Sequence, residues 1–312
     1  MPAIITHHLF GEDAARKLPA GISFDGEGLL AFLLGNQGPD PYYFCFTATP
    51  MAIATCHHLA ETMHREHVVE LLVAMRDTVT FLRPEDRGIG QAFALGVLAH
   101  YLLDSEAHAF IQAQEDAICD AGVGLEEAHD EVHVLIESEL DTWMLWNARS
   151  QTVLDAPAEA NLARTDRIGR VAGALFSQAA WQVFEIKVGA DQYERCVRDY
   201  ELIYRTIDPL GNPRGKMLAG AERLGMRSSR LEALAHDVSK SDTCPAANLE
   251  CHPWTDPLTG SEQTTSFPDV FYDALALWPN LAEAYLHKDL SAFASLVRRG
   301  YDGNALDDAP TD

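Results

Sequence analysis

The sequence is poor in basic residues and has no long uninterrupted apolar run. Its 23 lysines and arginines stand against 47 acidic residues, so the net charge is −24. This balance argues against non-specific binding to nucleic acid or to an anionic membrane surface. A small anionic substrate is still compatible, because bound cations invert the local field.

No run of about 18 uncharged apolar residues is present, so no transmembrane helix is expected. The first residues lack a basic region followed by an apolar stretch, so we expect no signal peptide and a cytoplasmic location.

Cysteine is sparse and has no paired pattern. The six cysteines are scattered, and none forms a CxxC motif. A reduced cytosolic protein fits this distribution best. The alternative concerns Cys244 and Cys251, which lie close together in an expected loop and would close a small disulfide if the protein were exported.

Alternating β-branched runs are also scarce, and apolar residues recur with helical spacing almost throughout. The sequence therefore predicts an all-α fold, with one helical domain over 1–301 and a disordered acidic tail over 302–312. Several X-Pro steps between 239 and 268 predict an irregular loop, which in a compact domain is usually functional or packed over a site. Helices are expected over 11–18, 25–34, 51–82 in one or two pieces, 84–117, 125–150, 165–189, 191–207, 213–224, 267–286 and 290–299.

One motif lies in the longest of these expected helices. His100, Asp104 and His108 are each four residues apart, so they share one helix face. At about 1.5 Å rise per residue, the outer two histidines lie roughly 12 Å apart along the axis. One tetrahedral zinc ion, with bonds of about 2 Å, would hardly reach both. The spacing therefore favours a carboxylate that bridges two ions. The alternative is a half-buried helix that carries two histidines and a capped acid.

Further metal-binding residue types gather in the same half of the chain, where ten of the thirteen histidines precede residue 134. His133 and Glu137 are again four apart, and two prolines fix the loop around Asp40. Histidine and carboxylate without thiolate suit zinc, with manganese or iron less well matched. The candidate ligands are His7, Asp40, His64, His100, Asp104, His108, His133 and Glu137. Eight ligands imply two or three ions, and clustered ions indicate phosphoester hydrolysis, because two ions can stabilise attacking and leaving oxygens together.

Neighbouring residues compete for some of these roles. His57, His58 and His67 compete with His64, and His8 competes with His7. We expect Asp141, on the same helix face as Glu137, to accept a hydrogen bond from a ligand histidine rather than to bind metal. The remaining histidines are expected to be exposed or structural: His129, His236, His252 and His287.

Taken along the chain, these motifs resemble those of the zinc-dependent phospholipases C of bacteria, and more closely those of their shorter relatives. The order and spacing agree across about residues 4–145, and 254–257 with 267–268 resemble a later segment of such relatives. The matching segments are 6–11 (THHLFG), 35–44 (GNQGPDPYYF), 63–66 (MHRE), 96–108 (GVLAHYLLDSEAH) and 133–141 (HVLIESELD).

The resemblance implies an all-α fold with a trinuclear zinc site. It implies one ion bound by Asp40, His64, His100 and Asp104, a second by His108, His133 and Glu137, and a third by His7 and Asp104. The implied activity is hydrolysis of a small-molecule or lipid phosphodiester by a water that zinc and Asp40 activate. The leaving alcohol would be diacylglycerol if the substrate is a phospholipid.

The sequence departs from the secreted members in three places. It has no N-terminal tryptophan whose α-amino group would bind the third ion, Ala109 replaces the proline that usually follows His108, and no segment indicates a membrane-binding β-sandwich. Two alternatives are a nuclease or nucleotidase on the same fold and a metal-binding protein without turnover. The acidic charge counts against the first, and three candidate carboxylate ligands count against the second. A third alternative, an HD-type phosphohydrolase prompted by His129-Asp130 and His236-Asp237, lacks supporting motifs.

Overall fold

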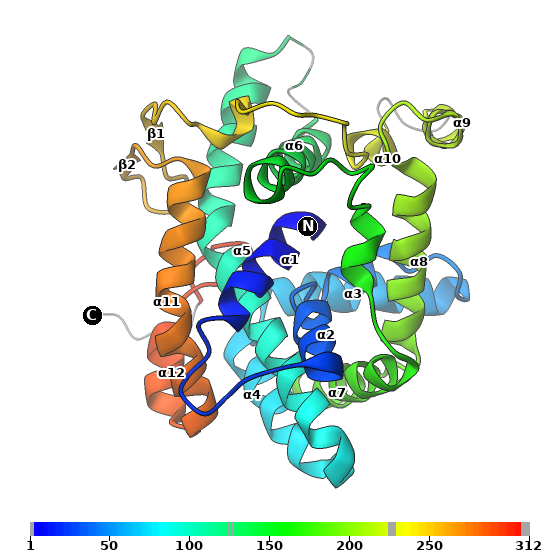
Figure 1. Cartoon of the computed structure of the whole chain (residues 1–312), viewed down its shortest axis with the longest axis vertical. Helices are drawn as coiled ribbons and strands as arrows, with labels where there is room; N and C mark the ends of the chain where they lie inside the picture. Colours follow the sequence, from blue (N-terminus) through cyan, green and yellow to red (C-terminus); the bar gives the residue numbers. More distant parts are fainter. Residues whose placement is uncertain (1–2, 124, 126–127, 224–228, 307–312) are drawn as a thin grey trace.

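The computed structural model describes residues 3–123, 125, 128–223 and 229–306 (Figure 1). Within these ranges the chain forms twelve α-helices, five short 3-10 helices and one two-stranded antiparallel sheet, which confirms the all-α fold. None of the helices in the described ranges has the length and hydropathy needed to cross a bilayer. The elements are α1 (Ile4–Ala15), α2 (Gly26–Gly35), η1 (Asp40–Phe44), α3 (Pro50–Arg65), α4 (Val68–Thr78), η2 (Val79–Phe81), η3 (Pro84–Asp86), α5 (Arg87–Ala121), α6 (His129–Arg149), η4 (Ala158–Leu162), α7 (Asp166–Phe184), α8 (Gln192–Ile207), α9 (Pro213–Glu222), α10 (Arg230–Ala233), η5 (Pro245–Ala247), β1 (Trp254–Thr255), β2 (Glu262–Gln263), α11 (Phe267–His287) and α12 (Leu290–Leu296).

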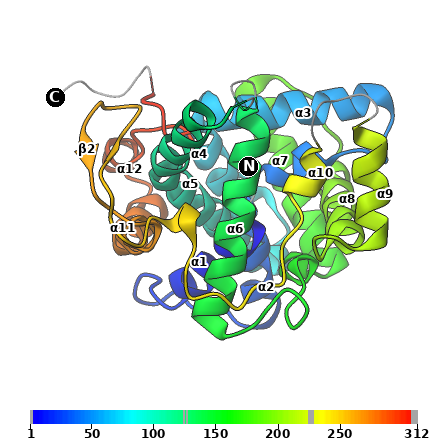
Figure 2. The ribbon, with the colours of Figure 1, turned by 90° about the horizontal axis from the view of Figure 1, so that it is seen from above.

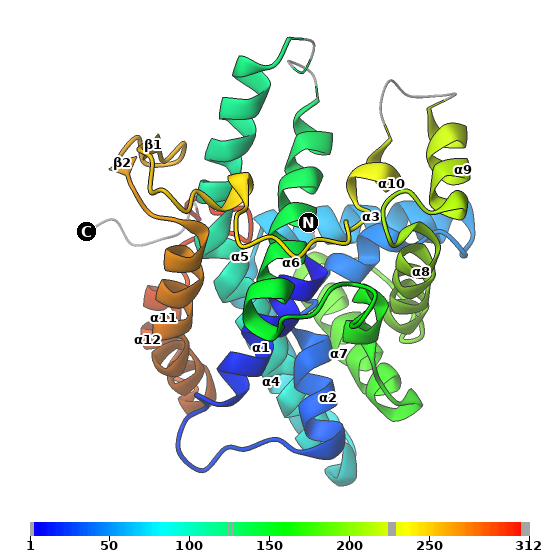
Figure 3. The same cartoon turned by 45° about the horizontal axis from the view of Figure 1, so that its top comes forward.

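Helix α5 is the centre of the fold, and most of its residues from Ile89 to Ile111 are buried. Seen from above, α11, α12 and the small sheet lie on one side of α5, and α8 and α9 lie on the other (Figure 2). Beyond the body of the protein, α5 and α6 continue together as a neighbouring pair (Figure 3). Residues of α1, α2, α4, α6, α7 and α11 all contact α5. The long apolar run of this helix is therefore explained by neighbours on nearly every side.

Two glycines let α2 approach α5 closely. A Cβ on Gly96 would lie 2.1 Å from the Phe32 carbonyl oxygen, and one on Gly35 would lie 2.4 Å from the Phe93 carbonyl oxygen. The chain then turns at Gly38, which has φ +51°, and a Cβ there would lie 2.1 Å from the His100 ring. These contacts leave no room for side chains. They place the loop before η1 directly against His100.

Several element boundaries correct the sequence expectation. Helix α1 begins at Ile4 rather than at Gly11, because Ile4, Ile5 and Phe10 bury an apolar face against the core. His7 therefore lies on a helix. For 51–82, where one or two helices were expected, the structure has two, separated at His67, whose φ is +52°. The short helix α10 was not expected.

The C-terminal segment corrects a second expectation. Residues 302–306, assigned to a disordered tail, fold back on the helices, and Arg299 forms an isolated antiparallel bridge with Ala305. The Gly300 amide donates to the Asn304 carbonyl at 2.7 Å, and the Leu306 amide donates to the Arg298 carbonyl at 3.1 Å. Backbone pairing of this kind orders the segment despite its polar composition. The rest of the expected tail, 307–312, lies outside the described residues.

The irregular segment expected over 239–268 ends where α11 begins at Phe267, and before that point it contains only η5 and the β1–β2 hairpin as regular structure. In the hairpin, Trp254 pairs with Gln263 and Thr255 pairs with Glu262. The Trp254 indole N–H donates to the Thr265 carbonyl at 3.1 Å, and its ring meets Phe110 of α5 edge-on at 5.5 Å. This loop is thus fixed to the central helix two residues beyond His108.

Candidate metal centre

The eight candidate ligands come from five elements that meet beside α5. The structure places all eight in three groups, and the ligand atoms of each group lie within 4.8 Å of one another. Two of the groups share His100, so they form one continuous cluster. The groups are Asp40, His64 and His100; His7, His100 and Asp104; and His108, His133 and Glu137.

The first group joins η1, α3 and α5 and is almost completely buried. Asp40 Oδ1 lies 3.0 Å from His64 Nε2 and 3.9 Å from His100 Nε2. The exposed fractions of Asp40, His64 and His100 are 1%, 6% and 0%. Burying polar atoms without a compensating partner is costly, and Asp40 Oδ2 and His100 Nε2 have none among the described residues. Such a group needs a cation or a proton at its centre.

Asp104 connects this group to the residues on either side. Its Oδ1 lies 3.1 Å from His7 Nε2, and its Oδ2 lies 3.6 Å from His100 Nε2. His108 Nδ1 is 3.9 Å from Asp104 Oδ1. The carboxylate thus lies between histidines of α1 and α5, with a different histidine near each oxygen. The geometry suits a bridging carboxylate.

The third group joins α5 and α6 and is more open. His133 Nε2 lies 3.4 Å from Glu137 Oε1, and the rings of His108 and His133 stack with centroids 5.5 Å apart. His108 and His133 are partly exposed, whereas Glu137 is buried. The spacing of four residues on α6 brings His133 and Glu137 together as the sequence indicated.

Four of the histidines present the same ring nitrogen to the cluster. The Nδ1 atoms of His64, His100 and His108 bond to the backbone carbonyls of Ala60 (2.7 Å), Asn36 (3.1 Å) and Asp104 (3.1 Å). His133 Nδ1 bonds to the Glu115 carboxylate at 2.8 Å. A carbonyl or carboxylate oxygen accepts, so each Nδ1 carries the proton and donates it. Each of these rings is therefore left with Nε2 as the nitrogen that can bind an ion, as in metal-binding histidines.

The electrostatics differ between the two ends of the site. Burial, reinforced by the charge of His7, lowers the pKa of His100 to about 3. Burial also acts to lower the pKa of His133, but the Glu137 and Glu115 carboxylates outweigh it and raise this pKa to about 9. Burial would raise the pKa of Asp40, yet His100 and His64 lower it to about 2. The site thus keeps its carboxylate ionised beside a neutral histidine.

Orphaned polar atoms show that these residues fit a bound metal. Asp40 Oδ2, Asp104 Oδ2, His100 Nε2 and His7 Nδ1 are all buried and have no hydrogen-bond partner among the described residues. Buried polar atoms are normally paired. Three of these atoms belong to residues that converge at less than 4 Å, and oxygen with imidazole nitrogen is the donor set of catalytic zinc sites.

Asp141 corrects a prediction, because its partner is not a candidate ligand histidine. Its two oxygens accept from the backbone amides of Ile5 at 2.9 Å and Thr6 at 2.7 Å, at the start of α1. His236 Nε2 also lies 3.2 Å from Asp141, and His236 Nδ1 lies 2.8 Å from Asp208. Unpaired amides at a helix start attract a carboxylate. Asp141 therefore supports His7 through the backbone of its helix.

The competing histidines point elsewhere. His58 and His67 are exposed, His57 is partly exposed, and none of them belongs to a ligand group, whereas His64 does. His8 lies 3.5 Å from Glu12, one helical turn along α1. His129 is exposed, as expected, and is 2.7 Å from Glu115. The two remaining histidines of the C-terminal part, His252 and His287, are largely exposed and lie beside acidic side chains.

Sequence reasoning missed two residues of the site. Glu115 lies seven residues after His108 on the same face of α5, and that spacing was a usable signal. Tyr301 had no such signal, because it approaches from the C-terminal segment. Its amide donates to the His64 carbonyl at 3.0 Å, and its buried ring lies 5.0 Å from the His64 ring and 5.6 Å from the His100 ring, between centroids.

Comparison with known proteins agrees with this geometry. A family model described as zinc-dependent phospholipase C matches residues 6–180, more than half of the chain, and this span contains all eight candidate ligands. No curated protein and no solved structure gives a significant match. The chain therefore belongs to the zinc-dependent phospholipase C family.

Proposed function

We propose that this protein is a zinc-dependent phosphodiester hydrolase of the phospholipase C type, with a lipid or small-molecule phosphodiester as substrate. The observation that carries the proposal is the set of four histidines whose Nδ1 protons are donated to fixed oxygens, and of which His64, His100 and His133 turn Nε2 toward a carboxylate. This arrangement lies within the span that matches the family.

The donor atoms suggest how ions would be shared. His100 has one nitrogen available, because its Nδ1 is bonded to Asn36, so it binds a single ion. Asp104 has two oxygens, near different histidines, and can serve two ions. We assign Asp40, His64, His100 and Asp104 to one ion, His108, His133 and Glu137 to a second, and His7 with Asp104 to a third. Bound zinc would lower the pKa of a coordinated water to about 7 and neutralise charge on the phosphoryl oxygens.

The chain's own residues would orient the reaction. Asp40 is ionised at neutral pH, because its pKa is lowered to about 2. Its Oδ1 lies against His64, whereas its Oδ2 has no partner among the described residues. Oδ2 is thus placed to accept a hydrogen bond, and then a proton, from a water attacking phosphorus. The fixed loop before η1 holds this oxygen in position.

The test is a metal and substrate analysis of the full chain. We expect at least two zinc ions per chain by mass spectrometry, and release of phosphorylated head group from a short-chain phosphatidylcholine. Turnover should be faster on this dispersed substrate than on anionic vesicles, because a net charge of −24 opposes docking on such a surface.

Asp40→Asn is the informative variant, since it keeps the shape of the side chain and removes its charge. Asp13→Asn is the matched control, because Asp13 is paired with Arg16 near the end of α1 and is no candidate ligand. Hydrolysis of single-stranded DNA or nucleotides in preference to lipid would replace the proposed substrate class. Less than one ion per chain, or full activity in Asp40→Asn, would overturn the proposal.

A further inference from the structure

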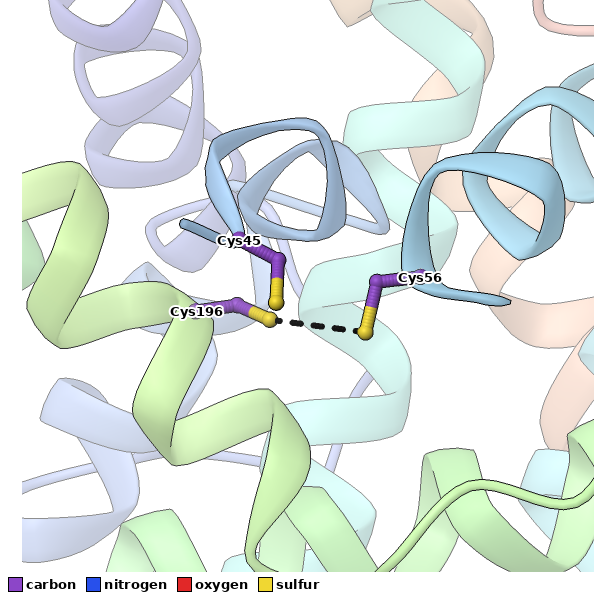
Figure 4. Close-up of side chains that lie close together, drawn as sticks. All are labelled: Cys45, Cys56 and Cys196. Carbon is purple, nitrogen blue, oxygen red and sulfur yellow. Dashed lines mark hydrogen bonds between the residues drawn. The ribbon is translucent and has the colours of Figure 1, made fainter. Parts of the chain in front are cut away.

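Three cysteines from distant parts of the chain meet in the core. Cys45 directly follows η1, Cys56 lies on α3 and Cys196 lies on α8 (Figure 4). Their sulfur atoms lie within 4.8 Å of one another, and the Cys56 and Cys196 sulfurs are 4.0 Å apart. The exposed fractions of the three residues are 1%, 0% and 0%. This cysteine cluster shares no residue with the candidate zinc centre.

The sulfur spacing matches a metal–thiolate site. In an equilateral triangle of sulfurs, the distance from a central ion to each sulfur is the edge length divided by √3. With the 4.0 Å separation of Cys56 and Cys196 as the edge, that distance is about 2.3 Å, which is the zinc–thiolate bond length. Soft thiolates select ions such as Zn²⁺ and Cu⁺. The other two sulfur separations are at most 4.8 Å, so at most a small contraction of the cluster is needed to bind one.

A buried amide beside the sulfurs is the second observation. Gln192 Nε2 lies 3.3 Å from Cys45 Sγ and 3.7 Å from Cys196 Sγ, and the residue is 9% exposed. Cysteines that only fill a core behave as small apolar groups and need no donor. Buried thiolates do need donors, because an unpaired buried charge is very unfavourable.

We propose that Cys45, Cys56 and Cys196 bind one thiophilic metal ion, Zn²⁺ or Cu⁺, as three thiolates with Gln192 donating to the sulfurs. The thiol protons pass to solvent when the ion binds, and the ion enters as the chain folds. This proposal is independent of the proposed hydrolase activity, because it concerns different ligands.

The position of the cluster indicates a structural role. Around it, α8 already holds the loop that carries Asp40: the Tyr193 hydroxyl donates to the Gly38 carbonyl at 3.0 Å, and Asp199 accepts from the Phe46 and Thr47 amides at 2.8 Å. A metal bound by Cys45 after η1, Cys56 of α3 and Cys196 of α8 would cross-link the two segments that supply Asp40 and His64.

The experiment uses Co²⁺ as a spectroscopic probe. The full chain is expressed with Co²⁺ in place of zinc and purified under a phosphine reductant. Thiolate ligands give Co²⁺ an intense near-ultraviolet charge-transfer band, which histidine and carboxylate ligands do not. We expect this band in the wild type, with an amplitude of one three-thiolate ion per chain. Wild type without the band overturns the proposal, and this measurement needs no variant to fold.

Two serine variants locate the ligands. Cys196→Ser should lose the band and one equivalent of metal, and Cys119→Ser, another buried cysteine outside the cluster, should retain both. An undiminished band in Cys196→Ser overturns the assignment. Expression with Zn²⁺ and with Cu⁺, followed by mass spectrometry of the metal content, identifies the native ion. A Cys56–Cys196 disulfide in protein alkylated before reduction would also overturn the proposal.

Discussion

The two ends of the candidate centre use the same donor types in different surroundings. The buried end, Asp40 with His64 and His100, is fixed by backbone carbonyls that no substitution removes. At the open end, His133 depends on the side chain of Glu115. Burial lowers the pKa of His100 to about 3, so its ring is neutral before metal binds, whereas carboxylates raise the pKa of His133 to about 9. The comparison teaches that the same ligand types need not bind metal equally. An ion that binds at the open end must displace a proton from His133, whereas an ion that binds at the buried end displaces none from His100.

The largest expected effect comes from breaking the link between the two ends. Asp104→Asn removes the charge that lies between His7, His100 and His108. We expect more than about 100-fold loss of turnover, beyond the range for residues that act through a ligand, together with loss of at least one zinc ion by mass spectrometry.

The control for that variant is Asp141→Asn, another buried aspartate beside α1. Asp141 bonds to helix amides and to His236, so its replacement should weaken the fold more than it weakens metal binding. Equal metal loss in the two variants would contradict the bridging role of Asp104.

The second prediction concerns His236, which is held by carboxylates as His133 is but is no candidate metal ligand. His236 lies between Asp141 and Asp208; burial acts to lower its pKa, but the two carboxylates outweigh it and raise the pKa to about 10. A raised pKa in the folded state stabilises the protein fully below the unfolded value of 6.5, and the contribution disappears as pH rises through 10. His236→Gln should therefore lower the free energy of unfolding by about 3 kcal/mol near pH 6, the range for a broken buried ion pair.

Denaturant unfolding at several pH values tests this. The difference between wild type and His236→Gln should shrink toward pH 10, while zinc content stays at the wild-type level. A difference that is constant with pH would mean that packing, rather than charge, accounts for the loss.

Much of the centre could be predicted from the sequence, and the reason is helical geometry. Spacings of four residues on α5 and α6 place His100, Asp104 and His108 on one face and His133 beside Glu137, whatever the rest of the chain does. The fold class follows from the same periodicity. The eight predicted ligands are all brought together.

The failures at Asp141, at Tyr301 and at the cysteine cluster share one physical cause, which is contact between residues far apart in sequence. Asp141 has a histidine partner 95 residues away, and Tyr301 reaches His64 from the other end of the chain. The three sulfurs of the cysteine cluster come from the residue after η1, from α3 and from α8, so no CxxC motif indicated them. Local periodicity carries no information on such pairs.

The third prediction sharpens the contrast between the two ends. Glu115→Gln keeps a hydrogen-bond acceptor beside His133 Nδ1 but removes its charge. We expect zinc affinity at the open end to fall by about 10–100-fold, as is typical for a residue that orients a ligand histidine. Zinc release to a chelator should become faster for one ion and remain unchanged for the others. Asp116→Asn, next in sequence and about half exposed, is the control and should leave release unchanged. Faster release of every ion would contradict independent ends.

The smallest expected effect concerns Tyr301, at the buried end. Its ring lies against His64 and His100, and its buried hydroxyl has no hydrogen-bond partner among the described residues. A buried hydroxyl without a hydrogen-bond partner costs stability. Tyr301→Phe should therefore leave the free energy of unfolding unchanged or raise it slightly. If the hydroxyl donates to the substrate's phosphoryl group, turnover should fall roughly 5-fold, the equivalent of about 1 kcal/mol.

Tyr101→Phe is the matched control, because the Tyr101 hydroxyl donates to the Arg299 carbonyl at 2.9 Å and its ring lies 5.2 Å from that of Tyr301. That variant should lose stability and keep its turnover. Unchanged turnover in Tyr301→Phe would leave this residue as packing for the buried end, and the two ends would then differ in metal binding alone.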